Sequence, residues 1–490
     1  MLRNTELKSW NGVWYLPGSS ERHHGVLVYN PEDSFQLTIF SEGFESPLVE
    51  LDVPPTRFEG FEQTGVIGIR DKSQPYDAVY GEADGKEVTL LGVFDGGHTT
   101  KYSAGGDSSE ATYYPELMLV GAHIPSKRAK VLTRLDVSFD YLSYWLNDMG
   151  WLDVGLKTTE VDPTYHEYFV RACVPEPPGP VAGLVINKEV ALTIGFQGVL
   201  PSLSTSAYGF QARSRIEAFT RFVAIDEPVE LDDFLVEVAK VEALLTICMD
   251  RPCKAHAFGC ELEFEDRKRQ VDLVVPRVGR VVPETETVRR MKELVTCSEE
   301  NSFVDLFRNW FALYSRNPAI GVISGFLNEA SGQPLESSVV MAQALVEAFH
   351  KTHVGKKSKD LLLKTVEHSE KMGRWHRGNQ ATTFQRALDL YFRLPEAVQR
   401  ELLSTPDYWA EALSAARNEI SHEAMLKTRS GLEAFAAAKI AVAVVTIHLL
   451  MALKVSEQEV LELFQRSNSL AKATNLAQKH LLQSSGGWVL

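Results

Sequence analysis

Three polar side chains near residue 420 have the types and spacing that could cut RNA without a metal ion. Arg417 is followed directly by the amide of Asn418, and His422 comes five residues after the arginine. RNA is cleaved when its own 2′-hydroxyl attacks the adjacent phosphorus, and a histidine can take up the proton near neutral pH. Arginine supplies permanent donors for the charge that builds up on the phosphate oxygens, and Asn418 can hold the reacting groups in place.

The same residues have a plain structural alternative, in which Arg417 forms a surface ion pair and His422 ends a helix. A helix turns by about 100° per residue, so Asn418 and His422 share a face while Arg417 and His422 lie about 140° apart. One regular helix therefore does not aim all three side chains at one phosphate. Either a helix end inside the motif or a second protomer with a second copy would complete the site.

Two basic clusters between residues 356 and 377 could hold RNA phosphates, and the aromatic side chains of the second could stack on a base. The alternative for both is a solvated loop and helix face. The first cluster consists of Lys356, Lys357 and Lys359, and the second of Arg374, Trp375, His376 and Arg377.

The remaining metal-ligand candidates form a poor pattern. The spacing of Cys248, Cys253, His256 and Cys260 matches no standard structural zinc site, so we expect buried thiols, no metal and no cofactor. Five cysteines in 490 residues are few and odd in number, which favours a reducing cytoplasm over a disulfide scaffold.

One apolar stretch, Ala434 to Leu453, is long enough to suggest a membrane span. It contains Lys439 and His448 and is rich in alanine, which makes it weakly hydrophobic on insertion scales. We therefore expect a buried core or dimer helix and no membrane association. The first residues also lack the basic-then-apolar layout of a secretory signal, so the cytoplasm is the expected location.

The charge is divided unevenly along the chain. Residues 301–490 carry 21 Lys+Arg and 18 Asp+Glu, a formal charge of +3. Because the whole chain has a net charge of −15, residues 1–300 have a net charge of −18. A polyanion such as RNA is therefore more compatible with the second part of the chain than with the first.

Short runs of alternating apolar and polar residues, broken by Gly, Pro, Asn and Asp, indicate a β-rich, sandwich-like N-terminal region at residues 1–285. The helical pattern that follows makes the chain an α+β multidomain protein. Asp84 and Gly85 supply the turn of a hairpin, and a helical period predicts a helix at residues 230–249. The strands are expected around residues 25–29, 35–39, 64–70, 77–91, 116–121, 184–187, 190–195, 216–224, 257–265 and 271–276.

A linker at residues 286–300 precedes an expected all-α domain at residues 301–490. Asp407 is an acidic first-turn residue of one of its helices, and Gly431 marks a break between two of them. The helices are expected at residues 302–314, 318–329, 335–352, 358–371, 380–393, 396–403, 406–420, 430–453, 456–466 and 469–484.

The motif around Arg417 resembles the R-x4-6-H motif of the HEPN superfamily, in its common form with a polar residue after the arginine. The N-terminal run from Trp10 to Gly18, the strands at residues 25–29 and 35–39 and the hairpin at residues 81–92 resemble ApeA-type proteins. These join a large β-rich region to a C-terminal HEPN domain and act in bacterial anti-phage defence. The resemblance covers essentially the whole chain.

The resemblance implies an abortive-infection endoribonuclease that cuts host RNA, with transfer RNA as the expected target. Arg417, Asn418 and His422 would be catalytic, a homodimer or higher homo-oligomer would form through the HEPN domain, and the N-terminal region would sense a phage-derived trigger. Two alternatives stay open. One is a ligand-binding β module whose helical domain only oligomerises, and the other is a domain that transfers a nucleotide.

Overall fold

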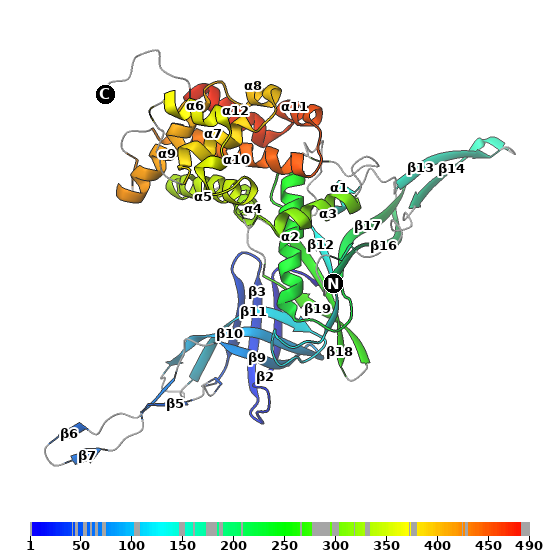
Figure 1. Cartoon of the computed structure of the whole chain (residues 1–490). Helices are drawn as coiled ribbons and strands as arrows, with labels where there is room; N and C mark the ends of the chain where they lie inside the picture. The colour runs from blue at the N-terminus through cyan, green and yellow to red at the C-terminus, as the bar shows by residue number, and fades with distance from the viewer. Residues whose placement is uncertain are drawn as a thin grey trace.

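Two regions follow one another in the chain, a β-rich region up to residue 276 and a helical region from residue 303 (Figure 1). This arrangement confirms the expected α+β multidomain fold. The expected linker at residues 286–300 lies outside the described residues except for Val295, so the domain boundaries stay predictions. The structure, a computed structural model, describes residues 2–41, 43–44, 48–51, 56–58, 61–63, 67–70, 75–101, 108–146, 152–159, 162–172, 184–185, 190–206, 209–264, 267–276, 295, 303–317, 319–328, 334–371, 373, 380–423, 425–426 and 430–481.

Each expected strand corresponds to an observed strand in the described residues, and several observed strands are longer than expected. The structure also has strands that the sequence does not predict, among them those at residues 132–139, 152–159 and 162–172. The observed strands are β1 (Leu2–Arg3), β2 (Lys8–Tyr15), β3 (His23–Asn30), β4 (Ser34–Ile39), β5 (Leu48–Leu51), β6 (Thr56–Phe58), β7 (Phe61–Gln63), β8 (Ile67–Arg70), β9 (Tyr76–Ala83), β10 (Lys86–Lys101), β11 (Ser108–Val120), β12 (Leu132–Phe139), β13 (Leu152–Thr159), β14 (Asp162–Ala172), β15 (Leu184–Val185), β16 (Val190–Ser206), β17 (Gly209–Ala224), β18 (Ala255–Phe264) and β19 (Arg267–Val274).

Six antiparallel strands close into a barrel in the order β10-β9-β2-β3-β4-β11, because β10 also pairs with β11. The hairpin between β9 and β10 turns at Asp84 and Gly85, which both have positive φ, as the sequence predicts. Trp14 fills the barrel interior, and a Cβ at Gly81 on the neighbouring strand would lie 2.4 Å from its ring. Glycine is therefore required where this indole crosses the barrel.

The sheet continues from β11 through β19, β18, β12, β17 and β16 to β15, so the strands form one continuous sheet instead of two separate stacked sheets. The pairs β13–β14, β5–β8 and β6–β7 are separate two-stranded ribbons. The barrel interior forms one hydrophobic cluster, and a larger cluster extends from the other face of the sheet into the helices.

The expected helices are all present in the described part of the chain, with ends that differ by a few residues, and the structure adds a short helix at residues 142–145 that the sequence does not predict. The observed helices are α1 (Leu142–Trp145), α2 (Leu231–Met249), α3 (Phe303–Tyr314), α4 (Ile320–Asn328), α5 (Leu335–His353), α6 (Leu363–Lys371), α7 (Thr383–Phe392), α8 (Glu396–Leu402), α9 (Pro406–Glu423), α10 (Gly431–Ala452), α11 (Glu457–Arg466) and α12 (Asn468–His480), together with the short 3-10 helix η2 (Ser358–Asp360).

The helix expected at residues 358–371 is interrupted at its start. The Asp360 carboxylate accepts a hydrogen bond from the Lys357 backbone N–H at 3.0 Å and closes the turn of η2. Leu361 is then extended, and α6 begins only at Leu363. A side chain that accepts from a nearby backbone N–H competes with the hydrogen bonds of a continuing helix. This is why the helical period alone misplaces this boundary.

Helix α2 joins the β-rich region to the helical region (Figure 1). Phe234 packs near Phe222 of the sheet, with ring centroids 6.4 Å apart, and the Trp310 indole N–H donates to the Lys240 carbonyl at 2.7 Å. At the end of α2 the Asp250 carboxylate accepts from the Ser469 backbone N–H at 3.0 Å, at the start of α12. The two regions therefore share a core.

Helix α10 lies at the centre of the helical region and packs against α5, α9 and α12. In the described part of the chain it is the one helix long and apolar enough to cross a membrane, with a mean hydropathy of 2.0, yet 83% of that window is buried in the fold. This confirms the expectation of a buried core helix for this stretch.

Candidate functional site

Helix α9 carries the three residues of the Arg417 motif, and its own sequence explains where it begins and how it packs. Pro406 occupies the first position, where the missing N–H costs nothing, and Asp407 complements the positive end of the helix dipole. Trp409 is fully buried and donates its indole N–H to the Ala437 carbonyl of α10 at 2.9 Å. Ala416 is the last buried residue of α9, so the motif begins where the packed part of the helix ends.

The motif lies on the outer part of α9. Arg417 is half-buried, Asn418 and His422 are exposed, and the Arg417 guanidinium donates from Nη1 to the Asn418 side-chain oxygen at 3.2 Å. The helix continues unbroken to Glu423, so no helix end separates Arg417 from His422. One chain therefore presents Asn418 and His422 on one face and Arg417 well around the helix. Of the two expected ways to complete the site, a helix end inside the motif is absent.

The direction of α9 places the motif beside the N-terminal ends of its neighbours. Helices α5 and α10 run parallel, because Leu335 lies next to Gly431 at their starts while Phe349 lies near His448 toward their ends. Helix α9 is antiparallel to α10, and its last turns project beyond the packed helices (Figure 1). These N-termini carry acidic first-turn residues, Glu336 on α5 and Glu433 on α10, and the Ser430 side chain caps α10.

The two basic clusters are not brought to the motif within one chain. Lys356, Lys357 and Lys359 are exposed in the segment after α5, at the opposite end from the motif. Nineteen residues of α5 separate the two ends, which corresponds to about 28 Å at the helical rise. The second expected cluster, Arg374, Trp375, His376 and Arg377, lies outside the described residues.

The cysteines are buried, as the sequence predicts. Cys248, Cys253 and Cys260 are buried free thiols, and burial raises the pKa of both Cys253 and Cys260. His256 instead contacts carboxylates, with its Nε2 3.0 Å from Glu217 Oε1. These thiols are therefore protonated, apolar core groups.

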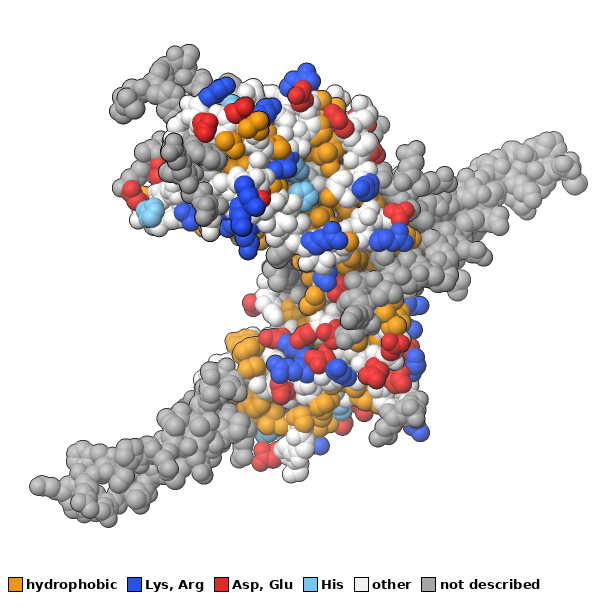
Figure 2. All heavy atoms as spheres, viewed as in Figure 1, with side chains coloured by type: hydrophobic (Ala, Val, Ile, Leu, Met, Phe, Trp, Pro, Cys, Tyr) orange, Lys and Arg blue, Asp and Glu red, His pale blue; other side chains and the backbone are white. Residues whose placement is uncertain are grey.

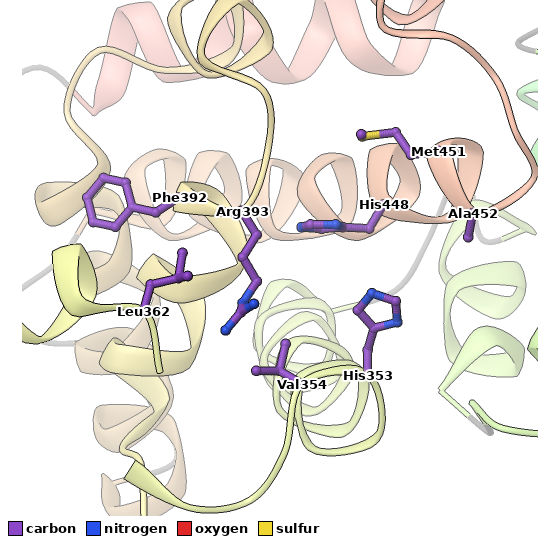
Figure 3. A pocket seen from close by; sticks show the side chains of 8 residues that line it. All are labelled: His353, Val354, Leu362, Phe392, Arg393, His448, Met451 and Ala452. Carbon is purple, nitrogen blue, oxygen red and sulfur yellow. The ribbon is translucent and has the colours of Figure 1, made fainter. Parts of the chain in front are cut away.

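A cavity of about 570 Å³ opens at the C-terminal ends of α5, α7 and α10. Its walls are mostly apolar and include Val354, Leu362, Phe392 and Met451. The polar groups that reach it are His353, Arg393 and His448 (Figure 3).

Arg393 is held in place by Asp389, one helical turn earlier on α7. The fully buried Asp389 carboxylate accepts from Arg393 Nε at 2.7 Å, His350 Nε2 at 3.1 Å, Thr365 Oγ1 at 2.9 Å and the Leu362 backbone N–H at 2.7 Å. Burial acts to raise the pKa of Asp389, but the hydrogen bonds from these donors outweigh it and hold the pKa below its usual range. Asp389 is thus a buried anion that fixes the orientation of Arg393.

Both histidines of the cavity are neutral near pH 7. Burial lowers the pKa of His448 to about 4, and burial together with the nearby charge of Arg393 lowers the pKa of His353. His448 Nε2 donates to the Leu390 carbonyl at 2.8 Å, which leaves Nδ1 as an acceptor. Arg393 is therefore the one permanently charged residue among the described residues that line the cavity.

The cavity residues belong to no recognisable sequence motif. Two weaker sequence features are consistent with a cavity here: Asp389 and Arg393 are four residues apart, and α10 has a single histidine in its buried core. Neither signal indicates that the ends of three helices meet around a hollow.

Comparison with known proteins identifies the N-terminal part of the chain. The model of the family described as ApeA N-terminal domain 1 matches residues 9–310, from β2 through α3 and over more than half of the chain. No curated protein and no solved structure matches. The β-rich region that precedes the helical region is thus the part by which the protein is recognised, and the chain belongs to the ApeA family.

Proposed function

We propose that this protein is a metal-independent HEPN endoribonuclease that cuts host RNA in abortive-infection defence against phages. Arg417, Asn418 and His422 would form the catalytic set, with His422 as the proton-transfer group, Arg417 as the phosphate clamp and Asn418 as the positioning amide. Transfer RNA is the expected target, and the cytoplasm is the expected location.

The observation that carries the proposal is the position of the motif on the last turns of α9, beyond the last buried residue, Ala416. Neither Arg417 nor His422 forms an ion pair with another residue in the described part of the chain, so both are available to an outside anion. The contact between Arg417 and Asn418 directs the amide oxygen to the guanidinium and leaves the amide N–H donors for a substrate. Membership of the ApeA family supports a role in anti-phage defence.

The geometry of α9 favours a dimer or higher homo-oligomer for activity. Arg417 and His422 lie about 140° apart around one helix, so one motif cannot direct both at the same phosphate. A second chain that brings its motif against the exposed end of α9 would supply the missing side chain. The acidic β-rich region would then sense the phage-derived trigger while the helical region cuts.

The decisive test is cleavage of RNA by the purified full chain in EDTA, with wild type beside Arg417→Ala and His422→Ala. Cleavage by wild type alone is expected, with 2′,3′-cyclic phosphate and 5′-hydroxyl ends. DNA of the same sequence should stay intact because it lacks the attacking 2′-hydroxyl.

Cleavage by all three proteins would contradict the proposal, because it would come from another site or another protein. If none cleaves, the test is repeated in a lysate of phage-infected cells, where a trigger is present. Failure there as well would favour the alternative of a ligand-binding β module with an oligomerising helical region. A requirement for ATP, with label transferred to the RNA, would favour nucleotide transfer instead.

A further inference from the structure

The cavity at the ends of α5, α7 and α10 contains a prepared anion-binding group. Two bonds anchor the Arg393 guanidinium, from Nε to Asp389 at 2.7 Å and from Nη2 to the Asp360 carbonyl at 3.0 Å. Arginine has five N–H donors. The other three make no hydrogen bond in the described part of the chain, and Arg393 lines the cavity. A guanidinium held in this way loses little side-chain entropy when it binds an anion.

The rest of the wall fits a flat, mostly apolar group. Phe392, Val354 and Met451 supply apolar surface, while the rings of His353 and His448 lie 6.2 Å apart, centroid to centroid (Figure 3). The unprotonated Nδ1 of His448 can accept a hydrogen bond from an amino group. A volume of about 570 Å³ lies within the range of small-ligand sites, roughly 300–1,000 Å³.

The rim of the cavity is basic. Val354 and Leu362 both line it, and the segment that joins them carries the exposed Lys356, Lys357 and Lys359. Lys364 lies over the Phe392 ring at 4.6 Å from its centroid. Figure 2 shows Lys, Arg and His side chains gathered on the front of the helical region. These cations attract an anion toward the cavity even though the whole chain has a formal charge of −15.

The shape of the basic segment is itself fixed. Gly355 has φ +146°, and a Cβ there would lie 2.4 Å from the Asp360 carboxylate. That carboxylate binds the Lys357 backbone, while the Asp360 carbonyl binds Arg393. The rim and the guanidinium are therefore parts of one hydrogen-bonded unit, in which only glycine fits at position 355.

We propose that this cavity binds a nucleoside phosphate, with the phosphate on Arg393 and the base against Phe392, Val354 and His448. A cavity with one guanidinium and mostly apolar walls is complementary to a ligand that combines an anionic group with a flat ring. Inorganic phosphate would leave the apolar wall uncovered. The site lies at the opposite end of α10 from Gly431, about 26 Å along the helix. The inference does not rest on the proposed cleavage site.

Binding is tested with the purified full chain and the mono- and triphosphates of adenosine, guanosine, cytidine and uridine, by calorimetry and thermal shift. Inorganic phosphate and a short single-stranded RNA serve as comparison ligands. At least one nucleotide should bind and raise the unfolding temperature. Arg393→Lys should weaken that binding by about tenfold or more, because lysine cannot keep both anchors and the forked donor set.

Two further variants keep the test independent of folding defects. Met451→Trp should block binding by filling the cavity, and His353→Ala changes an exposed wall residue with little risk to the core. Arg400→Gln, an exposed arginine of α8 outside the cavity, should bind like wild type.

The proposal is overturned if no nucleotide binds at about 1 mM, which corresponds to a Kd above that order. It is also overturned if binding is unchanged in Arg393→Lys, Met451→Trp and His353→Ala. Equal binding of inorganic phosphate would exclude a role for the base. If RNA binds but no free nucleotide does, the surface would be a binding site for single-stranded RNA instead. Neither result depends on RNA cleavage, so failure here and failure of the proposed nuclease are distinguishable.

Discussion

The β-rich region and the helical region use their charged side chains differently. On the sheet, opposite charges face one another across neighbouring strands. Arg221 lies opposite Asp136 and binds it at 2.7 Å, and Arg134 lies opposite Glu261 and binds it at 3.2 Å. Charges satisfied within the sheet are poorly available to an external partner.

The helical region also has ion pairs, such as Lys351 with Glu347, and it contains the buried Asp389 carboxylate that holds the partly exposed Arg393. In contrast, Lys356, Lys357, Arg417 and His422 form no ion pair in the described part of the chain. Loops and helix ends have no neighbouring strand to supply a partner. These cations have no ion-pair partner in the described part of the chain, so we expect anion binding in the helical region and not on the sheet.

The largest expected effect compares a histidine from each region. His422→Ala should lower the rate of RNA cleavage by about 10³-fold, because it removes the proposed proton-transfer group. His24→Ala, an exposed histidine on β3, should leave the rate unchanged. The measurement is the initial cleavage rate in EDTA. Equal rates for the two variants would show that the motif on α9 is not the cleavage site.

The second comparison uses two acidic residues. Asp389→Asn should lower the free energy of unfolding by about 3–4 kcal/mol, because it leaves buried donors without their anion. Asp136→Asn should cost about 1 kcal/mol, since its arginine partner is partly exposed to water. Urea unfolding followed by circular dichroism measures both. If the two variants lose the same stability, Asp389 is not the organising anion inferred for the cavity.

The third comparison uses pH. The unfolded chain protonates His448 near pH 6.5, whereas the folded protein does so only near its pKa of about 4. Lowering the pH from 7 to 5 therefore favours the unfolded state, and this residue should account for about 2 kcal/mol of lost stability.

In His448→Gln the difference in unfolding free energy between pH 7 and pH 5 should shrink by that amount. His123, whose pKa burial also lowers, is the counterpart in the β-rich region, and His123→Gln should change the pH dependence less. An unchanged pH dependence in His448→Gln would mean that His448 can protonate in the folded state.

The smallest effects should be alike in the two regions, because they come from local backbone features. Gly85→Ala forces a side chain into a residue with φ +73° and should cost about 1 kcal/mol. Ser430→Ala removes the hydroxyl that accepts from the Glu433 backbone N–H at 3.1 Å and should cost a similar amount, about 1 kcal/mol. Thermal unfolding measures both, and a loss of several kcal/mol in either would reveal tertiary contacts that the local geometry does not account for.

Local sequence signals predict the elements of this protein well. The helical period places α2 within one residue of its observed start, and the Asp84-Gly85 turn predicts the hairpin of β9 and β10. Alanine-rich α10 is recognisable as a core helix because it contains His448 and Lys439. These features depend on residues that are close together in the chain, so the sequence alone is sufficient.

The candidate site is predicted only in part. The types and order of Arg417, Asn418 and His422 are visible in the sequence, and their angular separation follows from helical geometry. That α9 continues unbroken to Glu423 is a property of the structure, and it removes the helix end that one of the two expected completions of the site required. The start of α6 is predicted wrongly, because the Asp360 side chain closes a turn where the helical period predicts a continuous helix.

The α+β order of the chain, most of its helices and strands, and the residues of the motif can be predicted from the sequence, because each depends on local spacing and conformation. Tertiary contacts, in turn, close six strands into a barrel, place Lys356 at the far end of α5 from the motif, and bring Arg393, held by Asp389, to the wall of a cavity. Strand pairing and helix direction depend on contacts between residues far apart in the chain, where burial and hydrogen-bond satisfaction select one arrangement among many that the local pattern allows.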